Sequence, residues 1–172
     1  MPLTLTWQER RELYQMLRPY LKNEKVQQMN TYIQHGSVST LQHCKYVAEV
    51  SCWLNRRLHI GANPHALLVG ALLHDFYLYD WHTDENHEHP LHGFRHPEIA
   101  RQNARRYFHV EKQTQDVIRC HMWPLTLTQV PVSRAAILVC IADKTCSLYE
   151  TLFLRRRYET LFLRRRKECT HA

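Results

Sequence analysis

The chain has 172 residues, 44% of them hydrophobic and 23% charged, a composition that excludes a disordered protein and suits one globular domain. With only four glycines and seven prolines, it is expected to be helical rather than many-stranded. The net charge is +7, but residues 149–168 carry seven basic and three acidic side chains, so most of the positive charge lies in the C-terminal segment.

Membrane and secretory signals are not evident in the sequence. No apolar run approaches the roughly 20 residues that cross a bilayer. The N-terminal segment carries charges where a signal peptide needs an apolar core. These features predict a cytoplasmic protein without a membrane span. The six cysteines form no CxxC pair, and we expect reduced thiols packed in the core.

The first predicted element is an amphipathic helix over about residues 6–20, where apolar side chains recur every three or four residues. A second helical piece is expected to follow through Met29 and Ile33. The tripeptide His-Gly-Ser at 35–37 predicts a break before the next helix, over about residues 39–59.

A nearly all-apolar helix is predicted from Pro64 to about Leu78, and such a helix should be central and buried. It carries His74 and Asp75 side by side. An unpaired carboxylate in apolar surroundings is strongly destabilising, so Asp75 needs a partner such as a metal ion.

The longest irregular stretch, residues 79–96, is polar and rich in histidine. Long loops of this kind are often functional. Two helices are expected next, at about residues 97–108 and 111–121. The final helix is predicted from about Pro131, with Asp143 in its middle.

The segment YETLFLRRR occurs at residues 149–157 and again at 158–166. A shift of nine residues rotates a helix by about 180°, so the two copies cannot present the same face to one core. We therefore expect residues 1–150 to form one helical bundle. Residues 151–172 are expected to form a basic helical extension that contains the second copy.

Six residues with metal-binding chemistry fall on or beside five separate predicted helices: His43, His74, Asp75, His96, His121 and Asp143. Helical bundles assemble metal sites from facing helices, so one bundle could bring these side chains together. Mixed imidazole and carboxylate ligands favour Fe, Mn, Zn or Co over Mg or Ca. Four of the remaining histidines are expected to be structural: His35, His59, His65 and His109. Three others are expected to be solvated in the loop: His82, His87 and His89.

The order H…HD…H…H…D resembles the signature of the HD superfamily of metal-dependent phosphohydrolases. It occurs here as TLQHCKYVA, LLHDFYL, FRHPEIA, IRCHMWP and CIADKTC. The resemblance covers about residues 38–150 and implies an all-α fold, a single compact HD-domain helical bundle. The chain looks most similar to the small bacterial HD hydrolases, which include the symmetrical dinucleoside tetraphosphatases.

The resemblance implies a first divalent ion held by four side chains, His43, His74, Asp75 and Asp143. It also implies a second ion, bridged to the first through Asp75 and held by His96 and His121. His74 and Asp75 are the catalytic pair in this pattern, and the implied cofactors are one or two ions of Fe, Mn, Zn or Co. Two such ions can hold the attacking and leaving oxygens of a displacement at phosphorus.

Two histidines are available as the ligand that follows the pair, His92 in LHGF and His96 in RHPEIA. His96 is favoured, because family members place this ligand at the start of a helix with a small residue a few positions on, as Ala100 is here. His92 is then expected near the mouth of the site.

A phosphorylated substrate needs cations near the ligands. The candidates for substrate binding are Arg95, Arg101, Arg134 and Lys144, together with His92. Many HD proteins carry a lysine shortly after the pair, but this chain reads HDFYLYD and lacks it.

These features predict hydrolysis of a phosphate ester or anhydride in a nucleotide-like substrate by metal-activated hydroxide. The alternative is a non-catalytic HD-fold module that binds a nucleotide or nucleic acid. The basic tail and the missing lysine favour the alternative, whereas the intact ligand set opposes it. The tail also predicts weak contact with a polyanion. A plain nucleic-acid-binding protein would rest on the tail alone.

Overall fold

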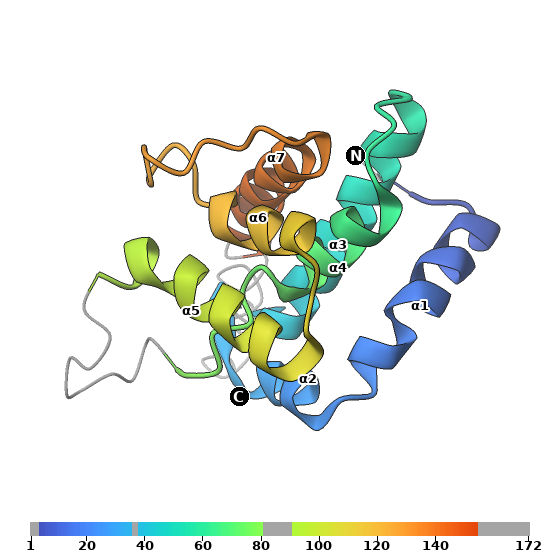
Figure 1. Ribbon diagram of the computed structural model, residues 1–172. Coiled ribbons are helices and arrows are strands. Elements are labelled where there is room, and N and C mark those ends of the chain that lie inside the picture. The colour runs from blue at the N-terminus through green and yellow to red at the C-terminus, as the bar shows by residue number, and fades with distance from the viewer. Residues whose placement is uncertain (1–3, 36–37, 81–90, 155–172) are drawn as a thin grey trace, which may run out of the picture.

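The computed structural model describes residues 4–35, 38–80 and 91–154, and these form a helical bundle with one small hairpin (Figure 1). The predicted all-α class and single compact bundle are confirmed. In chain order the elements are α1 (Trp7–Leu21), α2 (Glu24–Gln28), the 3₁₀ helix η1 (Met29–Thr31), β1 (Ile33–His35), β2 (Val38–Ser39), α3 (Thr40–Arg57), α4 (Pro64–Leu73), α5 (His92–Phe108), α6 (Lys112–Cys120), α7 (Arg134–Tyr149) and the π-helix η2 (Glu150–Leu154).

Helices α3 and α4 lie at the centre of the molecule (Figure 1). Helix α3 packs against α4 and α7, while α4 also contacts α6 and α7, and α5 covers α6. Every residue of α4 from Ala66 to Leu73 is buried, as its apolar composition predicts. Burying each large side chain of this kind contributes about 1.5–3 kcal/mol. Within the described residues, no helix is long and apolar enough to span a bilayer.

Local sequence signals fix where the helices begin. Thr6 and Glu9 form a capping box at α1. The side chain of Asn63 accepts from the amide of Ala66 and precedes a proline at the first position of α4. Ser133 caps α7 in the same way, so that helix begins at Arg134 rather than at the predicted Pro131.

Gly70 allows α4 and α6 to approach closely. A Cβ atom at this position would lie 2.5 Å from Cγ1 of Val117, a distance that packed carbon atoms do not adopt. The absence of a side chain therefore sets the spacing of these two helices. Each of them ends beside a predicted ligand, because His74 follows α4 and His121 follows α6.

Three predicted elements differ from the structure. Ile33 lies in β1, which pairs with β2 in an antiparallel hairpin, rather than in a second helical piece. Helix α4 ends at Leu73, so the His74–Asp75 pair stands just after the helix, and the chain turns away at Leu78, which has a φ of 62°. Helix α5 begins at His92 and includes Pro97, so the irregular stretch is shorter than predicted.

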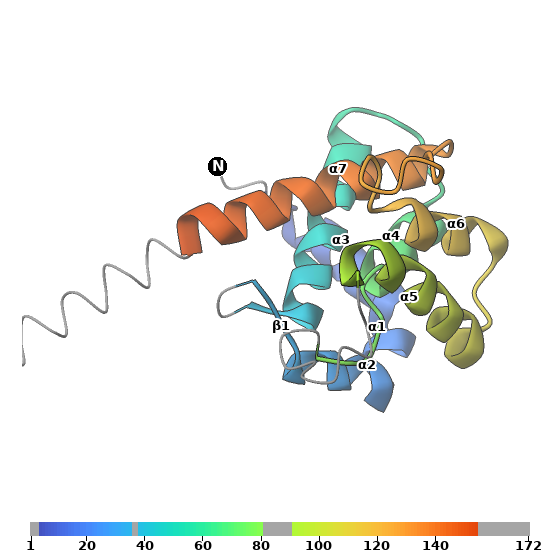
Figure 2. The same cartoon turned by 90° about the vertical axis from the view of Figure 1, so that its left-hand side faces the viewer.

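The predicted boundary at residue 150 falls inside a continuous helical segment. Figure 2 shows α7 crossing the bundle beside α3 and projecting past the other helices, and its last turn passes directly into η2. The second repeat copy and the loop histidines at 82, 87 and 89 lie outside the described residues. The domain division therefore stays a prediction. The five cysteines of the described part are buried and unpaired.

Candidate metal centre

Four imidazoles and two carboxylates converge at one buried point. His43 comes from the first turn of α3, His74 and Asp75 from the end of α4, and His96 from α5. The exposed fractions of the six side chains are very low: His43 0%, His74 0%, His121 1%, Asp75 2%, His96 4% and Asp143 7%. The structure thus brings together all six predicted ligands.

Asp75 lies between the two halves of this cluster. Its Oδ1 lies 3.1 Å from Nε2 of His96 and 3.5 Å from Nε2 of His121. Its Oδ2 lies 3.3 Å from Nε2 of His74 and 4.0 Å from Nε2 of His43. One carboxylate therefore faces all four rings.

Asp143 closes the other side of the cluster. Its Oδ1 lies 3.1 Å from Nε2 of His43 and 3.6 Å from Nε2 of His74. Ser147, one turn further along α7, donates to the same oxygen at 3.4 Å.

The Nδ1 atoms point away from the cluster and are held in place. In three of the rings, Nδ1 donates to a carbonyl three or four residues earlier: His74 to Ala71 at 2.8 Å, His96 to His92 at 2.9 Å and His121 to Ile118 at 2.7 Å. A carbonyl oxygen can only accept, so the proton lies on Nδ1 in each case. Their Nε2 atoms are therefore directed inward, the arrangement that metal-binding histidines adopt.

Two of the inward-facing atoms lack a hydrogen bond within the described part of the chain. Nε2 of His74 and Oδ1 of Asp75 are buried and, among the described residues, make no hydrogen bond. Nε2 of His96 lies 2.8 Å from Nε2 of His121, and both atoms also face Oδ1 of Asp75, at 3.1 Å and 3.5 Å. Buried polar atoms in this state are costly unless a cation occupies the space between them.

Two groups of three ligands could each hold an ion. Within each group, all donor atoms lie within 4.8 Å of one another. The first group is His43, His74 and Asp143, and the second is Asp75, His96 and His121. A third group combines the thiol of Cys44 with His74 and Asp75. The imidazole and carboxylate donors fit a divalent transition-metal ion.

The charges of the cluster are strongly coupled. Burial opposes the charged form of His43, but hydrogen bonds to Asp143 and Glu150 outweigh it and raise its pKa to about 10. Burial also opposes the charge of Asp75, yet the neighbouring His74 and His96 hold its pKa well below the usual value. The pKa of His121 is lowered to about 3 by burial and by the charges of His74 and His96. The site keeps its carboxylates ionised and attracts positive charge.

The model of the HD domain family matches residues 40–148, which is more than half of the chain and includes all six of these residues. The chain belongs to the HD domain family. This family places it in a superfamily of metal-dependent phosphohydrolases, which act on phosphorylated substrates. No curated protein and no solved structure matched the chain.

An open cavity of about 780 Å³ leads to this candidate metal cluster of the HD domain. Asp75, His96, His121 and Asp143 form its floor. One wall is apolar, and its side chains come from the loop after α6 and from the end of α7: Met122, Pro124, Leu125 and Leu148. The cavity thus offers a polar floor for a phosphate and an apolar wall for the rest of a ligand.

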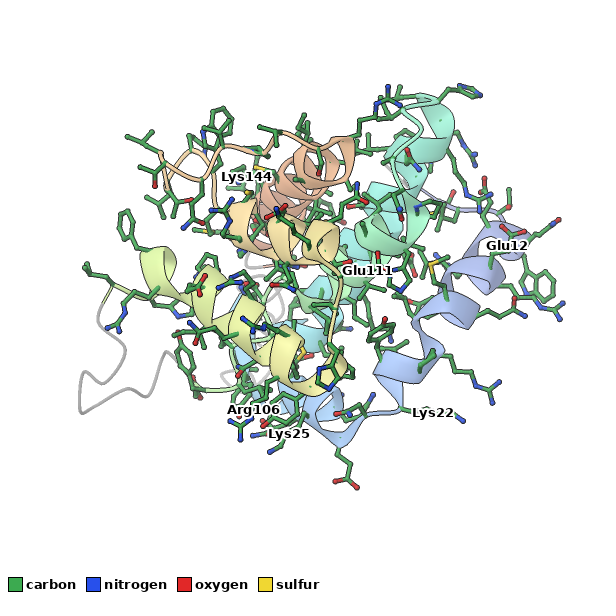
Figure 3. The ribbon with its side chains drawn as sticks, viewed as in Figure 1. Glu12, Lys22, Lys25, Arg106, Glu111 and Lys144 are labelled. Carbon is green, nitrogen blue, oxygen red and sulfur yellow. The ribbon has the colours of Figure 1, made fainter. Side chains whose placement is uncertain are left out.

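Two of the predicted substrate-binding residues line this cavity, Lys144 and His92. Nζ of Lys144 donates to the carbonyl of His121 at 2.8 Å. Figure 3 shows Lys144 beside α6 and α7, at the opposite end of the molecule from Lys22 and Arg106. His92 stacks on His96, with ring centroids 4.6 Å apart, so His96 rather than His92 reaches Asp75.

The other three substrate candidates do not line the cavity. Arg95 is exposed, and Arg101 is paired with Glu98 at 2.6 Å. Arg134 lies at the start of α7, where it approaches the carbonyl of Gly61 at 3.5 Å.

Sequence reasoning missed Gln34, a residue of β1 that lines the cavity. Its Nε2 donates to Oδ2 of Asp75 at 2.7 Å, while its Oε1 accepts from the hydroxyls of Tyr77 at 2.7 Å and Thr40 at 3.2 Å. These two donors fix the amide so that its NH₂ group faces Asp75. No motif marks Gln34, because its function depends on a hairpin that folds back over the HD pair.

Proposed function

We propose that this HD-domain protein hydrolyses a phosphate ester or anhydride of a nucleotide-like substrate at a centre with two divalent ions. The observation that carries the proposal is the convergence of inward-facing Nε2 atoms on Asp75 and Asp143 at the floor of an open cavity. A purely structural core would not leave Nε2 of His74 and Oδ1 of Asp75 without hydrogen bonds.

The ligands divide into two sets. One ion would be held by His43, His74 and Asp143, and the other by His96 and His121. Asp75 lies between the two sets, because its two oxygens face opposite halves of the cluster. When bound, ions of this kind supply positive charge to phosphoryl oxygens and lower the pKa of water.

The chain's own residues account for substrate placement. Lys144 and Ser147 line the cavity beside Asp143 and offer donors to phosphoryl oxygens. Met122 and Leu125 provide an apolar surface on which a nucleobase can lie. Gln34 also lines the cavity and donates to Asp75, so the carboxylate keeps its orientation while substrate enters.

The test begins with the metal content of the purified protein, measured by elemental analysis. Hydrolysis is then screened with nucleoside monophosphates, nucleoside triphosphates and dinucleoside polyphosphates in the presence of Mn²⁺ or Fe²⁺. Wild type should hydrolyse at least one of these compounds, whereas His74→Ala and Asp75→Ala should not. Metal binding without turnover of any compound would replace this proposal with the non-catalytic binding module.

A further inference from the structure

The carboxylate of Glu150 approaches the metal cluster from beyond the part of the chain that the family model matches. That match ends at residue 148. Glu150 begins η2, is 3% exposed, and its Oε2 lies 2.9 Å from Nδ1 of His43. A buried carboxylate is costly unless it is paired, so this contact needs a reason.

His43 differs from the other three rings in how its Nδ1 atom is held. His74, His96 and His121 donate to backbone carbonyls of their own helical turns, which follow from local geometry. His43 instead contacts a side chain 107 residues away. A carboxylate oxygen at Nδ1 accepts the proton of that nitrogen, and the contact turns Nε2 of His43 toward Asp143.

The backbone places Glu150 for this contact. It lies seven residues after Asp143, two helical turns along, so both carboxylates face α3. The contact between Glu150 and His43, in the first turn of α3, brings this end of α7 against α3. The helix changes to π geometry at Glu150, and such segments occur frequently at functional sites. His43 is thus held between two carboxylates of one helix, Asp143 at Nε2 and Glu150 at Nδ1.

We propose that Glu150 is a positioning residue of the metal centre, which orients His43 and strengthens it as a ligand through a carboxylate–histidine–metal relay. This inference rests on the proposed function. Outer partners of this kind typically change metal affinity by about 10- to 100-fold when they are removed.

The repeat in the sequence supplies a matched control. Glu150 and Glu159 occupy the same position of the two YETLFLRRR copies, so Glu150→Gln and Glu159→Gln make the same chemical change in the same local sequence. The full chain is titrated with Co²⁺ alone, and affinity is measured by calorimetry. We expect Glu150→Gln to weaken binding by about 10- to 100-fold, whereas Glu159→Gln should stay within about twofold of wild type. Thermal unfolding of the ion-free variants shows whether each one folds.

A second measurement does not depend on any variant's folding. In the Zn²⁺-loaded wild-type chain, ¹⁵N-edited NMR of the histidine rings should place the proton of His43 on Nδ1, in slow exchange with water. Equal Co²⁺ affinity in the two glutamine variants, or a His43 proton on Nε2, overturns the positioning role while the two-ion proposal stands. Failure of wild type itself to bind Co²⁺ overturns both.

Discussion

His96 and His121 face each other with their Nε2 atoms 2.8 Å apart, although 25 residues separate them in the sequence. Because each ring donates its Nδ1 proton to a backbone carbonyl, the two Nε2 atoms are turned toward each other and toward Oδ1 of Asp75, where both can bind one ion. We expect His121→Asn to remove one ion and to leave about half of the bound metal, as measured by elemental analysis.

The control for this variant is His59→Asn. His59 is exposed and has a φ of 51°, a conformation that asparagine tolerates. Its metal content should equal that of wild type. Full metal content in His121→Asn would contradict the second ion position.

Metal affinity should rise with pH because an ion must displace a proton from His43. Burial opposes the charge of His43, but Asp143 and Glu150 raise its pKa to about 10 in the ion-free protein. This proton stabilises the folded chain fully when the pH is below 6.5, the pKa of histidine in the unfolded chain. The stabilisation is lost as the pH rises through about 10, the pKa of His43 in the folded chain. The affinity for Mn²⁺ should therefore increase up to about tenfold per pH unit between about pH 6 and pH 9.

Calorimetry in buffers with different heats of ionisation measures both the affinity and the number of protons released. We expect release of at least one proton per chain. An affinity that stays constant over this pH range would mean that no proton is displaced from the cluster.

Gly70 should not tolerate alanine, because the added Cβ would lie 2.5 Å from Cγ1 of Val117. Overpacking of this kind costs about 1–3 kcal/mol, and the better helix propensity of alanine offsets about 1 kcal/mol of it. Urea denaturation should show that Val117→Ala rescues Gly70→Ala. The double variant should lose less unfolding free energy than the two single variants lose in sum. Additivity of the two changes would show that α4 and α6 adjust independently of this contact.

The hydroxyl of Tyr77 should matter to the site as well as to stability. It donates to Oε1 of Gln34 at 2.7 Å and thereby turns the amide NH₂ group toward Asp75. Tyr77→Phe should cost about 1 kcal/mol of unfolding free energy and lower the turnover of the best substrate, because the oxygen of the Gln34 amide is then held by the longer hydrogen bond from Thr40 alone. The control is Tyr46→Phe, at a half-exposed position. An unchanged rate in Tyr77→Phe would count against a role for Gln34 in orienting Asp75.

Lys144 and Arg134 allow a direct comparison of two predicted substrate cations on one helix. Lys144 lines the cavity, whereas Arg134 lies near Gly61 at the other end of α7. Lys144→Met keeps an apolar stem and removes the charge, and it should raise KM by about 10- to 100-fold. Arg134→Met should leave KM within about twofold. The opposite ranking in steady-state kinetics would place the substrate outside this cavity.

Several parts of the fold followed from the sequence by local rules. The all-apolar composition of α4 predicted its burial, and Asn63–Pro64 predicted its first residue. Local rules failed where the backbone depends on distant contacts. The HD pair stands just beyond α4 rather than within it, and Ile33 lies in a hairpin strand rather than a helix. Pro97 lies inside α5, although proline usually marks a helix start.

The same division between local rules and distant contacts holds for the candidate metal cluster, which includes His96 and His121. The sequence by itself determined which residue types stand at the ends of which helices, because the order of His and Asp and the apolar spacing are local properties. Only the tertiary structure decided that these two rings meet, that His96 rather than His92 reaches Asp75, and that Gln34 and Glu150 complete the surroundings. Periodicity encodes which face of a helix is buried, but it carries no information about which side chain, 100 residues away, packs against that face.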